Sequence, residues 1–283
     1  DGGGSGSSRV ATITGITNIT SMSWSRIADN DLFGVRKIVI NGSETLIDGA
    51  TIAPTGMSVG TKQGFSIIKY TGTGTAGTIP HGLLEQPKFV IIKDLKNTNS
   101  WAVQHFGTTL GTGLLKLDTN AASDDSVASA VWNSTAPTSS VFSVGTAGDV
   151  NYTTNSAEYI TYLWHDVPGL QKFGSYEGNG NVDGPYVELG FKPAVLILKN
   201  FDDTENWYIY DTVRMKNNPA FESLQASSDS AQENGSTNTR VDILSTGFKL
   251  RQSNGPNNSN SYIYMAWAEA PASNLFGGQS NAR

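Results

Sequence analysis

The sequence predicts an all-β protein made of two tandem β-sandwich repeats, of the jelly-roll or lectin-like kind, preceded by a small β-segment. Three observations predict this fold class. The 283 residues include 31 glycines and many Thr, Ser and Asn, which is typical of short strands joined by tight turns. Short apolar runs rich in β-branched residues are bounded by Pro and by polar turns. The same arrangement of residues also occurs twice along the chain.

The repeated arrangement has a spacing of 106 residues. The stretch Tyr70-Thr71-Gly72-Thr73-Gly74 recurs as Tyr176-Glu177-Gly178-Asn179-Gly180. We interpret the repetition as an internal duplication, because it continues without a gap over a long stretch. The same spacing relates Leu83 to Leu189, Pro87 to Pro193, Ile91 to Ile197, Lys93 to Lys199, Thr98 to Thr204, Trp101 to Trp207 and Phe142 to Phe248, and it shortens by three for Trp164 with Trp267 and Pro168 with Pro271.

Each copy contains the same order of expected strands. Six or seven short strands in about a hundred residues is the number found in a β-sandwich. The runs at 89–93 and 195–199 are short and continuously apolar, which predicts central strands covered on both faces. A single larger sandwich assembled from both copies is the alternative architecture. The other expected strands are 65–70, 101–105, 159–164, 207–210 and 262–267.

The expected domain boundaries follow from the repeats and from composition. Residues 1–9 have the composition of a flexible Gly/Ser linker. A small β-segment is expected at 10–62, the first repeat at 63–168 and the second at 169–283. Within the small segment, Asn41-Gly42 lies between two apolar-rich runs and predicts a hairpin, because both turn residues need positive φ. The chain opens on Asp1, which suggests processing or a piece of a longer protein.

Charge and composition exclude several classes of function. The net charge is −6, the pI is about 5.0, and Lys and Arg form no cluster, so we expect neither nucleic acid nor an anionic membrane as a partner. The sequence contains no run of eighteen apolar residues, so we expect no membrane insertion. The absence of Cys excludes disulfides, thiolate metal ligands and thiol nucleophiles. No cofactor is expected.

Candidate catalytic groups all have a simpler structural interpretation. His165-Asp166 has Ala268-Glu269 as its counterpart and is expected at a solvated strand end. The pairs Asp124-Asp125 and Asp202-Asp203 are expected in surface turns. Asn179-x-Asn181-x-Asp183-Gly184 imitates the start of a calcium loop but lacks its first Asp and its final Glu, so a turn that satisfies its own backbone is favoured. We therefore expect no enzyme activity and no metal site.

Aromatic residues are the best candidates for ligand binding, because sugar rings stack on their faces. Trp101, Trp164, Trp207 and Trp267 occupy repeated positions, which predicts a shared role in the core. Aromatic residues outside the shared pattern are better candidates for contact with a glycan. These are Trp132, Tyr152, Tyr186 and Tyr210.

The chain also carries a family resemblance, which is clearest where the first copy passes into the second. The stretch from Tyr162 to Tyr176, Tyr-Leu-Trp-His-Asp-Val-Pro-Gly-Leu-Gln-Lys-Phe-Gly-Ser-Tyr, is similar to a domain of virion structural and tail-fibre proteins of marine phages, especially those that infect cyanobacteria. The similarity covers residues 63–283. It continues through Gly178-Asn179-Gly180, Gly184-Pro185, Gly190-Phe191-Lys192-Pro193, the Lys199 strand, Trp207-Tyr208-Ile209-Tyr210-Asp211, Tyr264-Met265-Ala266-Trp267-Ala268-Glu269-Ala270-Pro271 and Asn281-Ala282-Arg283.

The resemblance implies a β-rich protein of the virion surface, hence an extracellular location. It implies a homo-oligomer, with a trimer favoured, that contacts other virion proteins, and it carries over no catalytic residues. It also suggests that the chain is the distal part of a longer fibre. The expected function is that of a fibre protein that binds host cell-surface glycans. The alternatives are a polysaccharide depolymerase on the same appendage and a structural filament subunit without a ligand.

Overall fold

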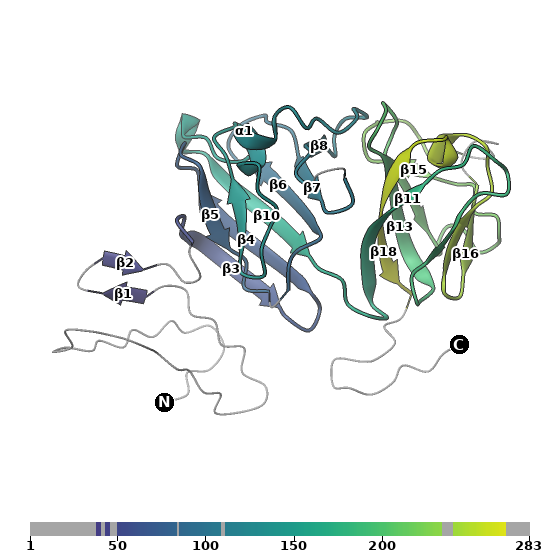
Figure 1. Cartoon of the computed structure of the whole chain (residues 1–283), viewed down its shortest axis with the longest axis horizontal. Helices are drawn as coiled ribbons and strands as arrows, with labels where there is room; N and C mark the ends of the chain where they lie inside the picture. The colour runs from purple at the N-terminus through teal and green to yellow at the C-terminus, as the bar shows by residue number, and fades with distance from the viewer. Residues whose placement is uncertain are drawn as a thin grey trace. The chain divides into compact units, whose positions relative to one another are not determined.

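The computed structural model describes residues 38–40, 43–45, 50–83, 85–108, 111–233 and 240–269 (Figure 1). Strands and turns form nearly all of this part, so the predicted all-β class is confirmed. The linker expected at 1–9 lies outside the described residues. No helix within these ranges has the length and apolar character needed to cross a bilayer. The helical elements are α1 (Ala128–Trp132) and the 3-10 turns η2 (Thr154–Ser156) and η3 (Gly255–Asn257).

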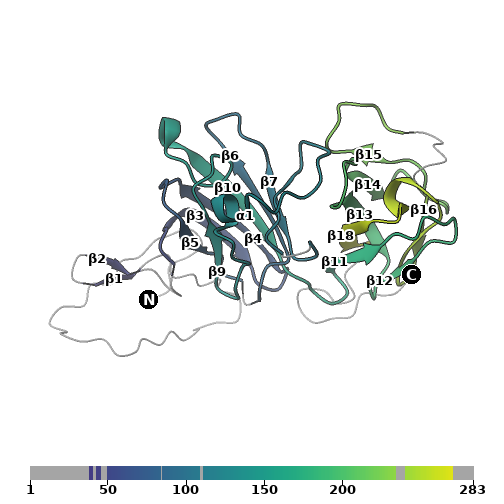
Figure 2. The same ribbon diagram turned by 45° about the horizontal axis from the view of Figure 1, so that its top comes forward.

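The first sandwich contains a six-stranded and a two-stranded antiparallel sheet. One buried cluster joins the two sheets and includes Ile68, Ile92, Ile79 and Phe142. Helix α1 adds Trp132 to this cluster, and Figures 1 and 2 both place α1 against this sandwich. The large sheet has the order β3 (Pro54–Gly60), β4 (Phe65–Thr71), β10 (Glu158–Trp164), β6 (Phe89–Asp94), β7 (Ala102–His105) and β8 (Leu115–Lys116), and the small sheet pairs β5 (Gly77–Pro80) with β9 (Val141–Val144).

The second sandwich contains a five-stranded and a three-stranded sheet. Its buried cluster joins Leu196, Leu198 and Tyr210 of the large sheet to Phe248 and Val241 of the small one. The large sheet has the order β11 (Gln171–Glu177), β18 (Ser261–Ala268), β13 (Pro193–Asn200), β14 (Tyr208–Asp211) and β15 (Leu224–Gln225), and the small sheet has the order β12 (Tyr186–Glu188), β17 (Gly247–Leu250) and β16 (Val241–Leu244).

The two large sheets share one strand order. β4-β10-β6-β7-β8 in the first corresponds to β11-β18-β13-β14-β15 in the second, and β4 and β11 begin 106 residues apart. The internal duplication remains our interpretation of this correspondence. The expected central strands are confirmed, because β6 lies between β10 and β7 and β13 lies between β18 and β14. Successive residues of a strand face opposite sides of the sheet, which is why these runs are apolar throughout.

The expected boundary at residue 62 is corrected by the pairing of β3. This strand forms the edge of the first large sheet, with Met57 opposite Ile68 on β4. Met57 and Val59 also pack against the first cluster, so residues 54–60 belong to that sandwich. The strands β1 (Ile38–Ile40) and β2 (Ser43–Thr45) pair antiparallel around residues 41–42, as the Asn-Gly pair predicts, whereas the rest of the segment from 10 to 49 lies outside the described residues.

A third buried cluster is shared by the two large sheets. Phe89 stacks on Phe173 with ring centroids 5.8 Å apart, and Trp164 meets Trp267 edge to face at 6.2 Å. Each sandwich therefore has its own core, and the two large sheets contribute together to this third one. We call it the shared cluster; its buried members are Phe89, Val103, Leu115, Phe173, Phe201, Trp207, Ile263 and Met265.

The repeated Tyr-x-Gly-x-Gly motif begins at a stacked tyrosine pair in each copy. Tyr70 stacks on Tyr159 at 5.2 Å, and Tyr176 stacks on Tyr262 at 5.0 Å. The first glycine of the motif allows a close backbone approach, because a Cβ at Gly72 would lie 2.0 Å from the Tyr152 carbonyl oxygen. At Gly178 the same atom would lie 1.9 Å from the Asn258 carbonyl oxygen. The motif is therefore explained by packing and not by a ligand.

Candidate functional site

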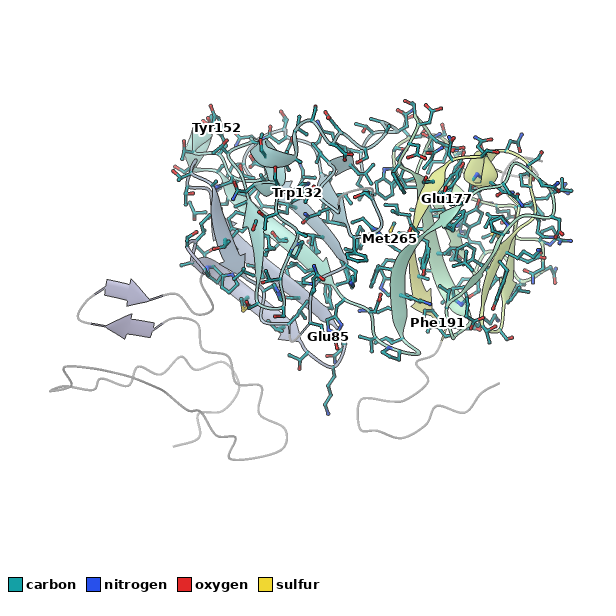
Figure 3. All side chains as sticks on the ribbon, viewed as in Figure 1. Glu85, Trp132, Tyr152, Glu177, Phe191 and Met265 are labelled. Carbon is teal, nitrogen blue, oxygen red and sulfur yellow. The ribbon has the colours of Figure 1, made fainter. Side chains whose placement is uncertain are left out.

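The four predicted ligand-binding aromatics are divided by their burial. Trp132 and Tyr210 have no exposed surface, whereas Tyr152 is 47% exposed and Tyr186 is 44% exposed. Figure 3 shows the labelled Trp132 inside the first sandwich and Tyr152 at one of its ends. The structure does not bring the four residues together. The glycan-contact prediction for Trp132 and Tyr210 is therefore corrected, because neither ring can be reached from solvent.

The burial of these two rings has a local cause. Trp132 is the last residue of α1 and packs into the first cluster. On β14, successive residues face opposite sides of the sheet, so Tyr208 and Tyr210 share a side and both enter the second cluster. In the first copy the position of Tyr210 is occupied by Gln104, which is also buried. The two copies therefore differ at this position in a buried core residue, and not in an exposed residue that could contact a ligand.

Tyr152 lies in the loop before η2. Its backbone N–H donates to the Tyr159 hydroxyl at 2.8 Å, and its carbonyl faces Gly72. The backbone of Tyr152 therefore supports the tyrosine pair, while its ring extends outward. Its hydroxyl makes no hydrogen bond within the described residues, whereas that of Tyr186 bonds Glu188, so we regard Tyr152 as the weaker of the two remaining candidates.

Tyr186 lies on the outer side of the three-stranded sheet. Its neighbour Val187 packs against the second cluster, so alternation directs Tyr186 and Glu188 outward. The tyrosine ring lies against β17, where a Cβ at Gly247 would be 3.1 Å from a ring carbon and 2.0 Å from the Val187 carbonyl oxygen. Glycine at this position lets the ring lie close to the strand, which is the use of glycine where another group approaches the backbone.

Charged side chains surround this ring on the same side of the sheet. Tyr186 is opposite Lys249 on β17, and Lys249 is opposite Asp242 on β16. Lys249 Nζ contacts Asp183 Oδ1 at 2.9 Å, and Arg251 Nε contacts Asp242 Oδ2 at 3.3 Å. We call this surface the Tyr186 face. It consists of Tyr186, Glu188, Asp242 and Lys249, with Asp183 and Arg251 at its margin.

Hydrogen bonds hold the polar groups of the Tyr186 face in place. The Tyr186 hydroxyl donates to Glu188 Oε2 and lies 2.7 Å from Thr246 Oγ1. The bond to Glu188 raises the pKa of Tyr186 above its usual value. The bond from Lys249 lowers the pKa of Asp183 below its usual value. An aromatic ring with fixed donors and acceptors beside it can stack on a sugar and hydrogen-bond its hydroxyls.

The charged members of the Tyr186 face were not predicted. The alternation of Tyr186, Val187 and Glu188 could have indicated a half-buried strand with a polar outer side, but the partners on β16 and β17 are more than fifty residues away in sequence. Residues 106 positions earlier carry neither an aromatic ring nor a charge. They are Gly77 for Asp183, Pro80 for Tyr186, Gly82 for Glu188, Ala136 for Asp242, Ser143 for Lys249 and Gly145 for Arg251.

His165 is buried and Asp166 is half-buried at the junction between the sandwiches, which corrects the expected solvated strand end for His165. His165 is only 6% exposed, because Gln171 Nε2 donates to its carbonyl at 2.8 Å and its N–H bonds the Gly64 carbonyl. His165 Nδ1 lies 2.7 Å from the Asp166 backbone oxygen. The Asp166 carboxylate instead accepts the Phe173 N–H at 2.8 Å, so the pair does not form a His–carboxylate relay.

The paired aspartates and the Asn-rich loop lie in turns, as predicted. Asp124 accepts bonds from both donors of Ser126, and Asn200 caps the turn that holds Asp202 and Asp203. In the Asn-rich loop, Asn179 Oδ1 accepts the Asn181 N–H and Asn181 Oδ1 accepts the Asp183 N–H. Within the described ranges, no three His, Asp or Glu side chains are grouped as metal ligands.

Together the sheets and clusters define an all-β protein with two sandwich cores and one exposed aromatic, charged sheet face. The chain belongs to the family described as a domain of unknown function, DUF7483, which matches residues 41–271 and so spans both sandwiches. No curated protein and no solved structure matches the chain.

Proposed function

We propose that the chain is a non-enzymatic module of a tail-fibre-type virion protein and that it binds host cell-surface glycans through the Tyr186 face. The observation that carries the binding proposal is the exposed Tyr186 ring, which lies close to β17 among charged side chains. The virion location, the contacts with other virion proteins and the favoured trimer rest on the sequence resemblance.

The chemistry of the Tyr186 face favours a saccharide over an apolar ligand. Its ring offers one apolar surface, and the other side chains of the face carry charges that form ion pairs or hydrogen bonds. A sugar presents the matching combination of a C–H face and a rim of hydroxyls. The acidic and basic groups are paired with each other, so the face can bond hydroxyls without the net positive charge that nucleic acid requires.

A glycan array probed with the purified chain tests the proposal. Tyr186→Ala should weaken binding about tenfold, because a stacked ring contributes about 0.5–1.5 kcal/mol beyond its buried area. Tyr186→Phe keeps the ring and should retain most of the affinity, whereas Tyr152→Ala is the matched control and should bind like the native chain. Equal binding by Tyr186→Ala and the native chain would remove the Tyr186 face from the proposal.

The two other functions are distinguished by separate measurements on the same protein. Incubation with host envelope polysaccharide should release no new reducing ends, and their release would indicate a depolymerase. A blank glycan array together with a stable trimer in light scattering would instead indicate a filament subunit without a ligand. A bound glycan together with a trimer is the result that we expect.

A further inference from the structure

The two sandwiches have cavities at corresponding places. Gln86, Phe106 and Pro137 line a cavity in the first sandwich. The residues 106 positions later, Lys192, Thr212 and Ile243, line a groove in the second. In the first copy the cavity lies between the start of β6 and the end of β7. In the second copy the groove lies between the start of β13 and the end of β14.

In the first sandwich this place is filled by the chain's own side chains. Lys88 Nζ lies 3.6 Å from the centre of the Phe106 ring, and both residues line the cavity with the buried Gln104. Only about 10 Å³ remains, which is the space of about one water molecule. Gln104 Oε1 is buried without a protein hydrogen-bond partner in the described residues, and one water there would satisfy it.

In the second sandwich the corresponding place is open. The smaller Thr212 stands at the position of Phe106, and the smaller Ala194 stands at the position of Lys88. The groove has a volume of about 340 Å³. This volume lies at the lower end of the range of about 300–1,000 Å³ for small-molecule sites. Because the same place is closed in the first copy, the fold itself does not require the groove.

The groove combines two lysines with two apolar side chains in a lining that is mainly polar. Lys192 Nζ pairs with Glu269 Oε2 at 2.7 Å, so a donor and an acceptor lie side by side. Lys216 also lines the groove, and it forms no ion pair within the part of the chain that the structure describes. The buried Met215 and the half-buried Ile243 also line the groove. One lysine of the groove is therefore left to attract a negative charge.

We infer that this groove binds a carboxylate-bearing sugar of the uronic acid kind, with the Lys216 ammonium as the partner of the carboxylate. Neighbouring sugar hydroxyls each donate and accept a hydrogen bond, and they match the Lys192–Glu269 pair. The C–H face of the sugar packs on Met215 and Ile243. The inference rests on the proposed glycan-binding function and names a second site, because the groove and the Tyr186 face have no residue in common.

Calorimetric titration of the full chain tests this inference. The probes are a trimer of galacturonic acid, the neutral galactose trimer and a tri-glutamate peptide. The acidic sugar should bind more tightly than the neutral one, and its affinity should fall with added salt. Lys216→Gln, at an exposed side chain, should weaken the acidic sugar about fivefold, the upper range for an exposed ion pair. Thr212→Phe copies the first sandwich and should abolish binding in the groove.

Lys62→Gln is the charge-matched control, because Lys62 is exposed in the turn between β3 and β4, and it should leave affinity unchanged. Equal affinity for the acidic and neutral trimers, or no effect of Lys216→Gln, would overturn the inference. Binding of tri-glutamate as tight as that of the acidic sugar would indicate an acidic peptide as the ligand and would also overturn it. If neutral glycans bind and only Tyr186→Ala weakens them, the proposed function stands without this groove. If no sugar binds at all, both proposals fail.

Discussion

Lys199 is a fully buried lysine at the edge of the shared cluster. Its Nζ donates to the Asn120 carbonyl oxygen at 3.2 Å and also to the Asn200 carbonyl oxygen. Burial lowers the pKa of Lys199 from 10.5 to about 8, although Glu205 and Asp203 partly counteract it. The Lys199 side chain thus connects the second sandwich to the loop of the first sandwich that contains Asn120. Its ammonium group is held away from water, which is energetically unfavourable.

The low pKa of Lys199 predicts a rise in stability with pH. Between about pH 8 and 10.5 the unfolded chain binds a proton that the folded chain has released, so the free energy of unfolding increases with pH. From pH 7 to 9.5 the gain should be about 2 kcal/mol. Urea denaturation of the native chain and of Lys199→Met across this range measures it. The variant should lack this part of the slope, and an unchanged slope in Lys199→Met would contradict the assignment.

His105 is a buried imidazole on the side of β7 that faces the shared cluster. Its Nδ1 accepts the Gly107 N–H at 2.9 Å, so in the neutral ring the proton is on Nε2. Burial lowers the pKa of His105 from 6.5 to about 3, and the backbone of Tyr264 offsets this only in part. A proton added to this ring in the folded protein would create a buried charge.

The low pKa of His105 predicts a loss of stability in acid. Below about pH 6.5 the His105 imidazole binds a proton in the unfolded chain, whereas in the folded chain it binds one only below about pH 3. Falling pH therefore favours unfolding. Between pH 7 and 4 the loss should be about 3 kcal/mol. The comparison of His105→Gln with the native chain by urea denaturation isolates this contribution from that of the carboxylates. Parallel pH profiles for the two proteins would refute the prediction.

At the scale of elements, each Gly-rich turn is held by one buried asparagine. Asn151 Oδ1 accepts the Thr73 N–H at 2.7 Å, and its Nδ2 donates to the carbonyls of Thr75 and Gly145, both at 2.8 Å. Asn257, which lies 106 residues later, makes the equivalent bonds to Asn179, Asn181 and Gln252. Both asparagines are fully buried, so each amide holds its turn from the inside of the sandwich.

Loss of either asparagine should therefore destabilise the protein strongly. Asn151→Ala and Asn257→Ala each remove three hydrogen bonds between a buried amide and the backbone, and we expect a loss of about 2–4 kcal/mol in the free energy of unfolding. Asn217→Ala, at an exposed side chain, is the control and should change stability by less than about 0.5 kcal/mol. Chemical denaturation measures all three variants. Similar stabilities for the buried and the exposed variants would show that the amides are not needed.

At the scale of the whole molecule, the shared cluster couples the two sandwiches. Trp207 of the second sandwich is fully buried, and its Nε1 donates to the carbonyl of Lys116 at 2.9 Å and to that of Thr119 at 3.2 Å. Further backbone bonds connect Ser123 to Phe201 and Glu205 to Asn120. Both apolar burial and hydrogen bonds therefore cross between the copies.

This coupling predicts one cooperative unfolding transition for both sandwiches. Trp207→Ala removes a buried indole and should cost about 3–5 kcal/mol. It should also separate the transition into two, because each sandwich keeps its own cluster. Differential scanning calorimetry shows the number of transitions. Trp101→Ala, at a half-buried residue outside the three clusters, is the control and should preserve a single transition. Two transitions in the native chain would contradict the coupling.

The pattern of apolar and polar residues along the sequence was enough to predict the strands and the central position of β6 and β13 in their sheets. Alternation and continuous apolar runs are local properties that each strand displays by itself. The candidate site was predicted less well, because two of its four aromatics are buried and its charged members were missed. Whether Trp132 or Tyr210 is exposed depends on residues far away in sequence that cover it.

The sequence by itself determined the all-β class, the spacing of 106 residues and the turn chemistry of the Asn- and Gly-rich segments, because these depend on neighbouring residues. Only the tertiary structure decided that the two large sheets share a cluster, that His165 is buried and that Tyr186 is joined by Lys249 and Asp242. These features depend on the packing of strands that are distant in sequence. The open groove of the second sandwich has the same origin, since it requires the absence of bulk from several separate segments at one place.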